Sequence, residues 1–112
     1  MFRQPQRDWN YAYQNLQSKL AQIVDYSGRV GHIVPDHMKL SPKIVLQTTP
    51  QELNGCIVSV EAFKQELQHD ELHKNRFDLK VALMMTERFD ADLRHFAEDF
   101  AKYVGDAHHY SE

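Results

Sequence analysis

Cysteine, clustered glycine and long apolar runs are all scarce in this sequence, and each scarcity excludes a class of protein. The single cysteine, Cys56, excludes an internal disulfide and a multi-cysteine zinc site. No apolar run approaches 18 residues, so no transmembrane helix is expected. The four glycines are isolated, which argues against a glycine-rich phosphate-binding loop. Residues 1–8 are polar and lack the apolar stretch of a signal peptide, so we expect a cytoplasmic protein.

Basic residues do not cluster, so direct binding to nucleic acid is not expected. The formal net charge of −3 is unevenly distributed, with a net +3 over residues 1–49 and a net −6 over residues 50–112. Complementary packing of the two halves would explain this asymmetry. The alternative is an acidic surface that contacts a basic protein partner.

The remaining composition is that of an ordinary globular chain. The length of 112 residues is enough for one domain with one core. Of these residues, 42% are hydrophobic and 26% are charged, which is typical of a globular chain. We therefore expect a single domain over residues 1–112, with flexible tails at residues 1–7 and 106–112.

Two aromatic stripes predict the first and last helices. The C-terminal stripe recurs every three to four residues, which places it on one helical face and predicts a helix over about residues 88–104, ended by Gly105. A matching spacing near the N-terminus predicts a helix that begins after Asp8 and ends at Gly28. The stripes consist of Met85, Phe89, Leu93, Phe96, Phe100 and Tyr103, and of Trp9, Tyr13, Leu16, Leu20 and Ile23.

The middle of the chain carries mixed signals. Thr49, Pro50 and Glu52 form a good helix start, but Asn54-Gly55 is expected to interrupt the helix at once. A further helix is expected from about Ser59 to Lys74. Short strands are expected at residues 30–34 and 44–46, and residues 57–60 fit either a strand or a continued helix.

Residues 77–85 are ambiguous. Phe77, Leu79, Val81, Leu83 and Met85 alternate with less apolar residues, which is the period of a strand. The composition nevertheless favours helix. We therefore predict an α+β fold of three helices with a small sheet of two to four short strands; the alternative is a mostly α fold with a long C-terminal helix.

One group of residues has the spacing of a metal site. His69 and His73 lie at positions i and i+4, and Glu66 lies about one turn earlier on the same side of the predicted helix. Such a set suits a divalent transition metal such as zinc, with His32, His37 or His108 as a further ligand. A solvated polar helix face is the simpler interpretation, so our leading expectation includes no cofactor.

No arrangement typical of a catalytic site is present, so the protein is more plausibly not an enzyme. We expect a small protein-interaction module, acting as a regulator, adaptor or inhibitor of an unidentified protein partner, with a second copy of the chain, in a homodimer, as one candidate partner. The aromatic stripes are expected to pack mainly on each other, with uncovered rings and neighbouring acidic residues left for an interface. The candidate interface residues are Trp9, Tyr13, Asp92, Phe96, Asp99 and Tyr103.

Overall fold

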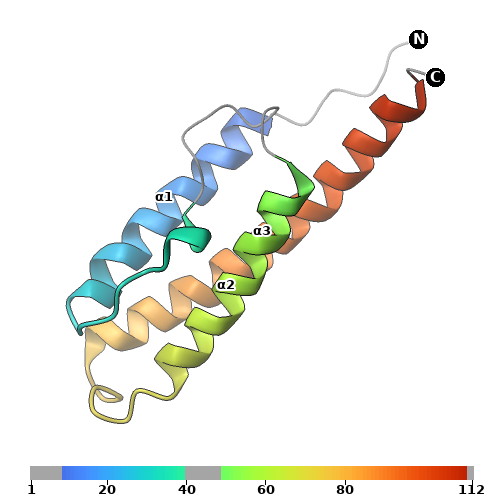
Figure 1. The fold of residues 1–112 in the computed structure, drawn as a ribbon. Coiled ribbons are helices and arrows are strands. Elements are labelled where there is room, and N and C mark those ends of the chain that lie inside the picture. The colour runs from blue at the N-terminus through green and yellow to red at the C-terminus, as the bar shows by residue number, and fades with distance from the viewer. Residues whose placement is uncertain (1–8, 40–48, 111–112) are drawn as a thin grey trace.

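The computed structural model describes residues 9–39 and 49–110, and these form an elongated bundle of three α-helices (Figure 1). Helix α1 spans Trp9–Gly28, α2 spans Pro50–Gln68 and α3 spans Phe77–Tyr110. A short 3₁₀ helix, η1, spans Asp36–Met38 in the connection between α1 and α2. No helix in the described ranges is both long enough and apolar enough to cross a membrane.

The predicted α+β class is wrong, because the described residues contain no strand. Residues 77–85 belong to α3 and residues 57–60 belong to α2, while residues 30–34 form a turn and an irregular stretch. The strand predicted at residues 44–46 lies outside the described residues. The alternative prediction, a mostly α fold with a long C-terminal helix, agrees with the all-helical architecture.

The first turns of α3 explain why the alternation was misleading. The buried series of α3 continues toward the N-terminus through Thr86, Ala82 and Leu79, at the same three- and four-residue spacing. Ala82 and Thr86 are small or polar and do not mark a core face by composition. Phe77, by contrast, is 70% exposed. The Thr86 hydroxyl donates to the carbonyl oxygen of Ala82 at 2.7 Å, so its burial leaves no unsatisfied donor.

Helix α2 begins as predicted and then departs from the prediction. The Thr49 side chain accepts from the Glu52 backbone N–H, and the Glu52 side chain accepts from the Thr49 N–H, which completes a capping box. The helix continues through Asn54 and Gly55 without interruption. It ends at Gln68, earlier than the predicted Lys74, and the loop that follows contains Asp70 and His73.

The ends of α1 and α3 test two glycine signals. Helix α1 ends at Gly28, as predicted. Helix α3 continues past Gly105 to Tyr110, so the predicted stop at that glycine is wrong, and residues 106–110 are helical. Figure 1 shows this last part of α3 extending beyond the starts of α1 and α2.

Helix α3 lies at the centre of the packing. It packs closely on both α1 and α2, whereas no Cα atom of α1 lies within 8 Å of a Cα atom of α2 in the described ranges. The connecting segment, which we define as residues 29–39, runs back between them (Figure 1), with η1 against α2. Its apolar side chains Val30, Val34 and Met38 are buried in the common core. This segment therefore completes the core between the two outer helices.

Gly55 and Gly31 provide a test of this backbone. A Cβ at Gly55 would meet nothing within 4 Å, and Gly55 is inside a helix, so Gly55→Ala should stabilise the protein by about 0.5–1 kcal/mol. Gly31 has a φ of 84°, so Gly31→Ala should destabilise it by about 1 kcal/mol although space is available. Urea denaturation measures both. Destabilisation by Gly55→Ala would indicate that α2 breaks at Asn54-Gly55 after all.

Candidate functional site

His32 is positioned by the turn that follows α1. The left-handed conformation of Gly31 reverses the chain, and the His32 backbone N–H donates to the Ser27 carbonyl oxygen at 3.0 Å. The ring then lies edge-on to Phe63 of α2, with ring centroids 6.5 Å apart. The turn thus directs the imidazole of the connecting segment onto the C-terminal half of α2.

Both ring nitrogens of His32 contact carboxylates. Nδ1 lies 2.6 Å from Oε2 of Glu66, and Nε2 lies 2.6 Å from Oδ2 of Asp70. An ionised carboxylate only accepts hydrogen bonds, so when both carboxylates are ionised both ring nitrogens donate and the ring is an imidazolium. His32 thus contacts one residue that lies 34 positions later in the sequence and another that lies 38 positions later.

The pKa values of this group follow from its geometry. Partial burial acts to lower the pKa of His32, but the hydrogen bonds to Asp70 and Glu66 outweigh it, and the pKa is raised. The His32 hydrogen bond is the main cause that holds the pKa of Asp70 well below its usual range, and His73 adds to this effect against the opposing effect of burial. Asp70 is therefore a carboxylate at neutral pH.

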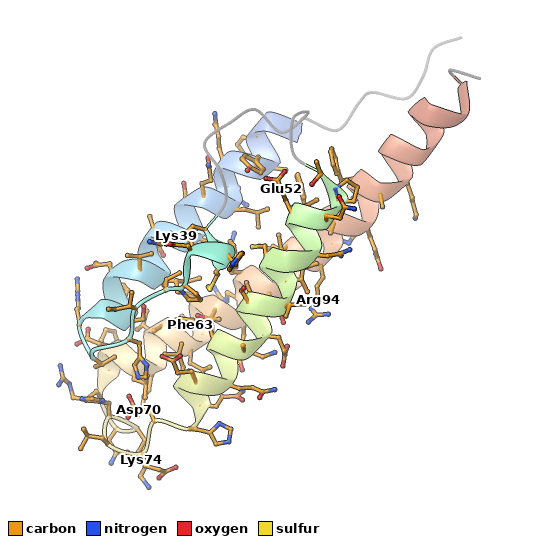
Figure 2. The ribbon with its side chains drawn as sticks, viewed as in Figure 1. Lys39, Glu52, Phe63, Asp70, Lys74 and Arg94 are labelled. Atoms are coloured by element: carbon orange, nitrogen blue, oxygen red, sulfur yellow. The ribbon has the colours of Figure 1, made fainter. Side chains whose placement is uncertain are left out.

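Asp70 and His73 belong to the loop between α2 and α3. Oδ1 of Asp70 accepts from the backbone N–H of His73 at 3.0 Å, and Oδ2 accepts from His73 Nδ1 at 2.8 Å. The Asp70 side chain is only 8% exposed, and that of His73 is 27% exposed. Figure 2 shows Asp70 at the end of the bundle near Lys74, with Lys39 and Glu52 toward the other end. The short loop thus presents a nearly buried carboxylate with an imidazole against it.

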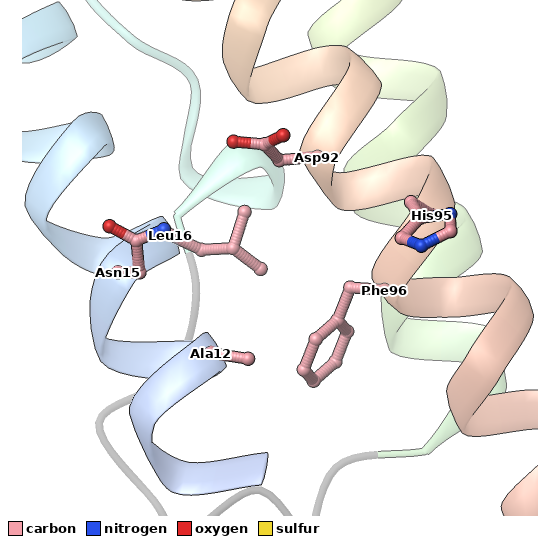
Figure 3. Close-up of a pocket in the computed structure, with 6 residues that line it drawn as sticks. All are labelled: Ala12, Asn15, Leu16, Asp92, His95 and Phe96. Carbon is pink, nitrogen blue, oxygen red and sulfur yellow. The ribbon is translucent and has the colours of Figure 1, made fainter. Parts of the chain in front are cut away.

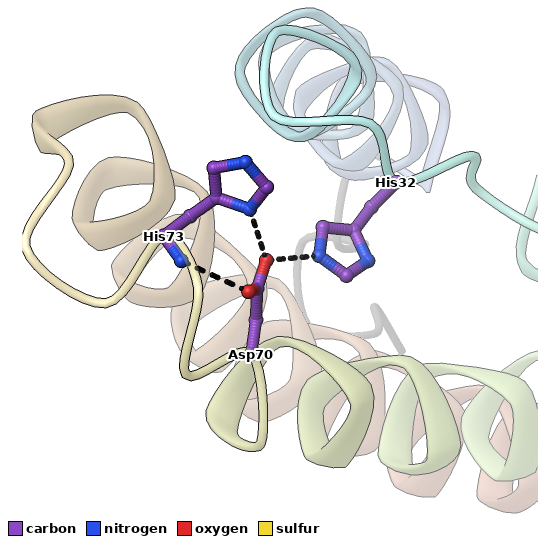
Figure 4. Close-up of side chains that lie close together, drawn as sticks. All are labelled: His32, Asp70 and His73. Atoms are coloured by element: carbon purple, nitrogen blue, oxygen red, sulfur yellow. Dashed lines mark hydrogen bonds and ion pairs between the residues drawn. The ribbon is translucent and has the colours of Figure 1, made fainter.

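His32, Asp70 and His73 converge from two segments (Figure 4). One ligand atom from each side chain lies within 4.8 Å of the other two. Ligand atoms around tetrahedral zinc are roughly 3.4 Å apart, given metal–ligand distances of about 2.0–2.2 Å. The distances from Asp70 Oδ2 to His32 Nε2 and to His73 Nδ1 are 2.6 and 2.8 Å. Each would have to lengthen by less than about 1 Å if one cation replaced the protons of these two hydrogen bonds.

The Glu66 carboxylate lies outside the cluster and contacts it through His32. It bonds Nδ1 of His32 and leaves Nε2 for Asp70 or a cation. A carboxylate on the far nitrogen of a ligating histidine fixes the ring orientation and increases its basicity. Glu66, predicted as a ligand, therefore lies outside the cluster and contacts the far nitrogen of His32.

The structure brings together part of the metal site predicted from the sequence. His73 lies in the cluster, and Glu66 lies beside it through His32. His69 instead donates through Nδ1 to the Gln65 carbonyl oxygen at 2.7 Å, as the first residue beyond α2. Asp70 and His32 take its place. His32 was foreseen only as one of several additional ligands, because sequence spacing does not show which loop residue folds back onto α2.

The predicted interface residues separate into core and surface. Tyr13 and Phe96 are buried at 4% and 1% exposure, with ring centroids 6.1 Å apart, so their principal contact is internal, as the paired stripes predicted. Asp92 is about half exposed and pairs with Lys19 at 3.1 Å. Asp99 lies 3.8 Å from His95. The side chains of Trp9 and Tyr103 lie outside the described part of the structure.

A shallow pocket of about 130 Å³ lies between α1 and α3 (Figure 3). Two of the predicted interface residues line it, Asp92 at its rim and the buried Phe96. The full lining consists of Ala12, Asn15, Leu16, Asp92, His95 and Phe96. The pocket contains no grouping of catalytic residues, but it is a concave surface with a partly exposed carboxylate.

One acidic residue of α3, Asp90, is not available to a partner. Asp90 is buried at 7% exposure between α2 and α3, where it accepts from Lys64 Nζ at 3.3 Å and from Arg94 Nε at 2.9 Å. Its charge is satisfied within the bundle. Asp90 therefore joins the two helices and is not presented to a partner.

Comparisons with protein-family models, with curated proteins and with solved structures found no match to this chain.

The raised pKa of His32 predicts a pH-dependent stability for the metal-free protein. The ion pairs of His32 stabilise the fold fully below the unfolded pKa of about 6.5, and this contribution is lost as the pH rises through the folded pKa. The free energy of unfolding should therefore fall on alkalinisation above about pH 6.5. Urea denaturation with a chelator present measures this fall.

His32→Gln should flatten that dependence between about pH 6 and 9, since its side chain does not titrate there. His69→Gln is the matched control and should keep it, because the His69 ring contacts only a backbone carbonyl oxygen among the bonds described. Equal slopes for the wild-type protein and His32→Gln would contradict the assignment.

Proposed function

We propose that this protein binds one divalent transition metal ion, best matched by zinc, through His32 Nε2, His73 Nδ1 and a carboxylate oxygen of Asp70. The observation that carries the proposal is the convergence of these three ligand atoms within 4.8 Å from two separate segments. Two imidazoles and one carboxylate are a ligand set that zinc accepts readily. The placement of Glu66 on the far nitrogen of His32 supports it further.

The electrostatics also favour a cation at this position. Asp70 is ionised at neutral pH and nearly buried, and it now receives its compensating charge from the His32 imidazolium. A metal ion would take over that role while His32 becomes neutral. Three protein ligands leave the fourth position of a tetrahedral ion to water or to an external donor.

A direct binding measurement tests the proposal. Tag-free protein titrated with zinc chloride in a calorimeter should bind one equivalent. His32→Ala and His73→Ala should each weaken binding at least about tenfold, because each removes a ligand, and Glu66→Gln should weaken it by about the same factor through the orientation of His32.

His69→Ala is the matched control and should bind zinc like the wild-type protein, since its ring is turned to the Gln65 carbonyl oxygen. The absence of saturable binding at one zinc per chain would refute the proposal. So would loss of binding in His69→Ala together with retention in His32→Ala, which would restore the site predicted from the sequence spacing.

A second candidate function is a protein-interaction module, including the homodimer version. It is favoured by the pocket between α1 and α3, because the pocket brings the half-exposed Asp92 and the exposed His95 to a concave surface. Charged and polar groups at a concave surface can steer and orient a protein partner. The burial of Tyr13, Phe96 and Asp90 removes these three side chains from such an interface.

Sedimentation equilibrium tests the homodimer version. If two copies meet at this pocket, the apparent mass should rise above 13.2 kDa with concentration, and Asp92→Lys should change the dissociation constant. Glu71→Lys is the control, because Glu71 lies in the loop between α2 and α3 and does not line the pocket. A monomer at high concentration would remove the homodimer version.

A further inference from the structure

The connecting segment covers the core where α1 and α2 fail to meet. Helix α3 packs closely on both of them, whereas no Cα atom of α1 lies within 8 Å of a Cα atom of α2 in the described residues. Val30, Val34 and Met38 fill the space instead, with exposures of 4%, 3% and 0%. Movement of this segment away from α2 would therefore uncover apolar core without requiring any of the three helices to unfold.

Cys56 lies directly beneath this segment. The thiol belongs to α2, is 2% exposed and donates to the carbonyl oxygen of Met38 at 3.2 Å. Burial raises its pKa to about 12, so the thiolate that reacts with alkylating reagents is scarcely formed in the closed state. The single cysteine of the chain thus reports whether the segment is closed over α2.

The polar attachment of the segment to α2 is concentrated at His32. Arg29 pairs with Asp25 of α1 and Asp78 of α3, and Lys39 pairs with Asp36 within the segment itself. Among the ion pairs described for residues 29–39, those of His32 are the ones that reach α2 and the loop after it. The attachment and the candidate metal ligand are the same side chain.

We propose that a metal ion at His32, Asp70 and His73 locks the connecting segment over α2, and that loss of the ion frees the segment to open. This inference rests on the proposed metal binding. His32 moves with the segment, while Asp70 and His73 stay with the loop after α2. The ion has three protein ligands only when the segment is closed, so it binds the closed state more tightly and shifts the equilibrium toward it.

Without a metal ion, the connecting segment is held over α2 less firmly. Without the ion, His32 is held by hydrogen bonds to Glu66, which is about half exposed, and to Asp70. The carboxylates keep their charge and regain water when the segment leaves. When the segment leaves, a metal ion loses His32 and keeps two protein ligands, so opening costs a metal–ligand bond that closure restores. The site therefore links metal occupancy to the exposure of the core between α1 and α2.

Alkylation of Cys56 under native conditions tests this inference. Iodoacetamide labelling of the full-length protein is followed by mass spectrometry, once with excess chelator and once with zinc at about 100 times the dissociation constant. A closed state that alone bound zinc would open about 100-fold less often, so we expect labelling to slow at least about tenfold, allowing for residual binding to the open state. Zinc should likewise slow hydrogen exchange at the Met38 and Lys39 amides, which donate to Pro35 and Asp36.

Two variants separate the lock from other effects of zinc. His73→Gln removes a ligand without altering the segment, so the same zinc concentration should slow labelling about tenfold less than in the wild-type protein. Equal slowing in both proteins would indicate direct capture of the thiol by zinc. His69→Ala should respond like the wild-type protein. If His73→Gln does not fold, as judged by circular dichroism, Asp70→Asn serves in its place, with amide exchange as a second readout in either variant.

The outcomes are distinguishable from those of the binding test. If calorimetry shows one bound zinc but labelling and amide exchange are unchanged, the lock is refuted and the proposed metal binding stands. If zinc slows labelling equally in the wild-type protein and in His73→Gln, the effect does not arise from this site and the lock is again refuted. If no zinc binds, the proposed function fails, and the lock fails with it.

Discussion

The packing of α1 and α2 on α3, and not on each other, is the constraint from which the rest of this structure follows. Three helices that all touched would close the core without help from the connections. Here the space between α1 and α2 must be filled, and Val30, Val34 and Met38 of the connecting segment fill it. A connection that is part of the core has to be held in register, and the polar contacts of His32 hold it.

The chemistry at His32 suits two states of the same site. A nearly buried Asp70 needs a positive partner, and in the metal-free protein that partner is the His32 imidazolium. The ring nitrogens that carry these protons are also good ligands for zinc, and Asp70 and His73 converge on the same position. Under the proposed function, proton and metal would be alternative occupants of one cluster, which gives a physical reason for a link between metal occupancy and closure of the segment.

Local signals in the sequence were accurate where the contacts they describe are local. The capping box of Thr49 and Glu52 and the end of α1 at Gly28 lie where they were predicted, because each depends on residues within one turn. The stripe from Phe89 to Phe100 is buried as predicted. The errors arose where weak local signals opposed the packing: Gly55 lies within α2, and residues 77–85 lie in α3 because Ala82 and Thr86 face the core.

The amino-acid sequence alone determined the amphipathic faces, the helix start at Thr49 and the neighbourhood of the candidate site, since these depend on spacing and side-chain chemistry over a few residues. It placed His73 and Glu66 in that neighbourhood and predicted His69 as the second histidine, whereas the cluster in the structure contains His32. Only the tertiary structure decided that α2 ends before His69, that the His69 ring turns to a backbone carbonyl oxygen, and that His32 arrives from 38 residues earlier to meet Asp70. The reason is that such contacts depend on how the connecting segment folds back over α2, which is set by the burial of Val30, Val34 and Met38. Their four-residue spacing resembles that of a helix, but most of the segment is a turn and an irregular stretch, so the spacing does not show where the segment packs.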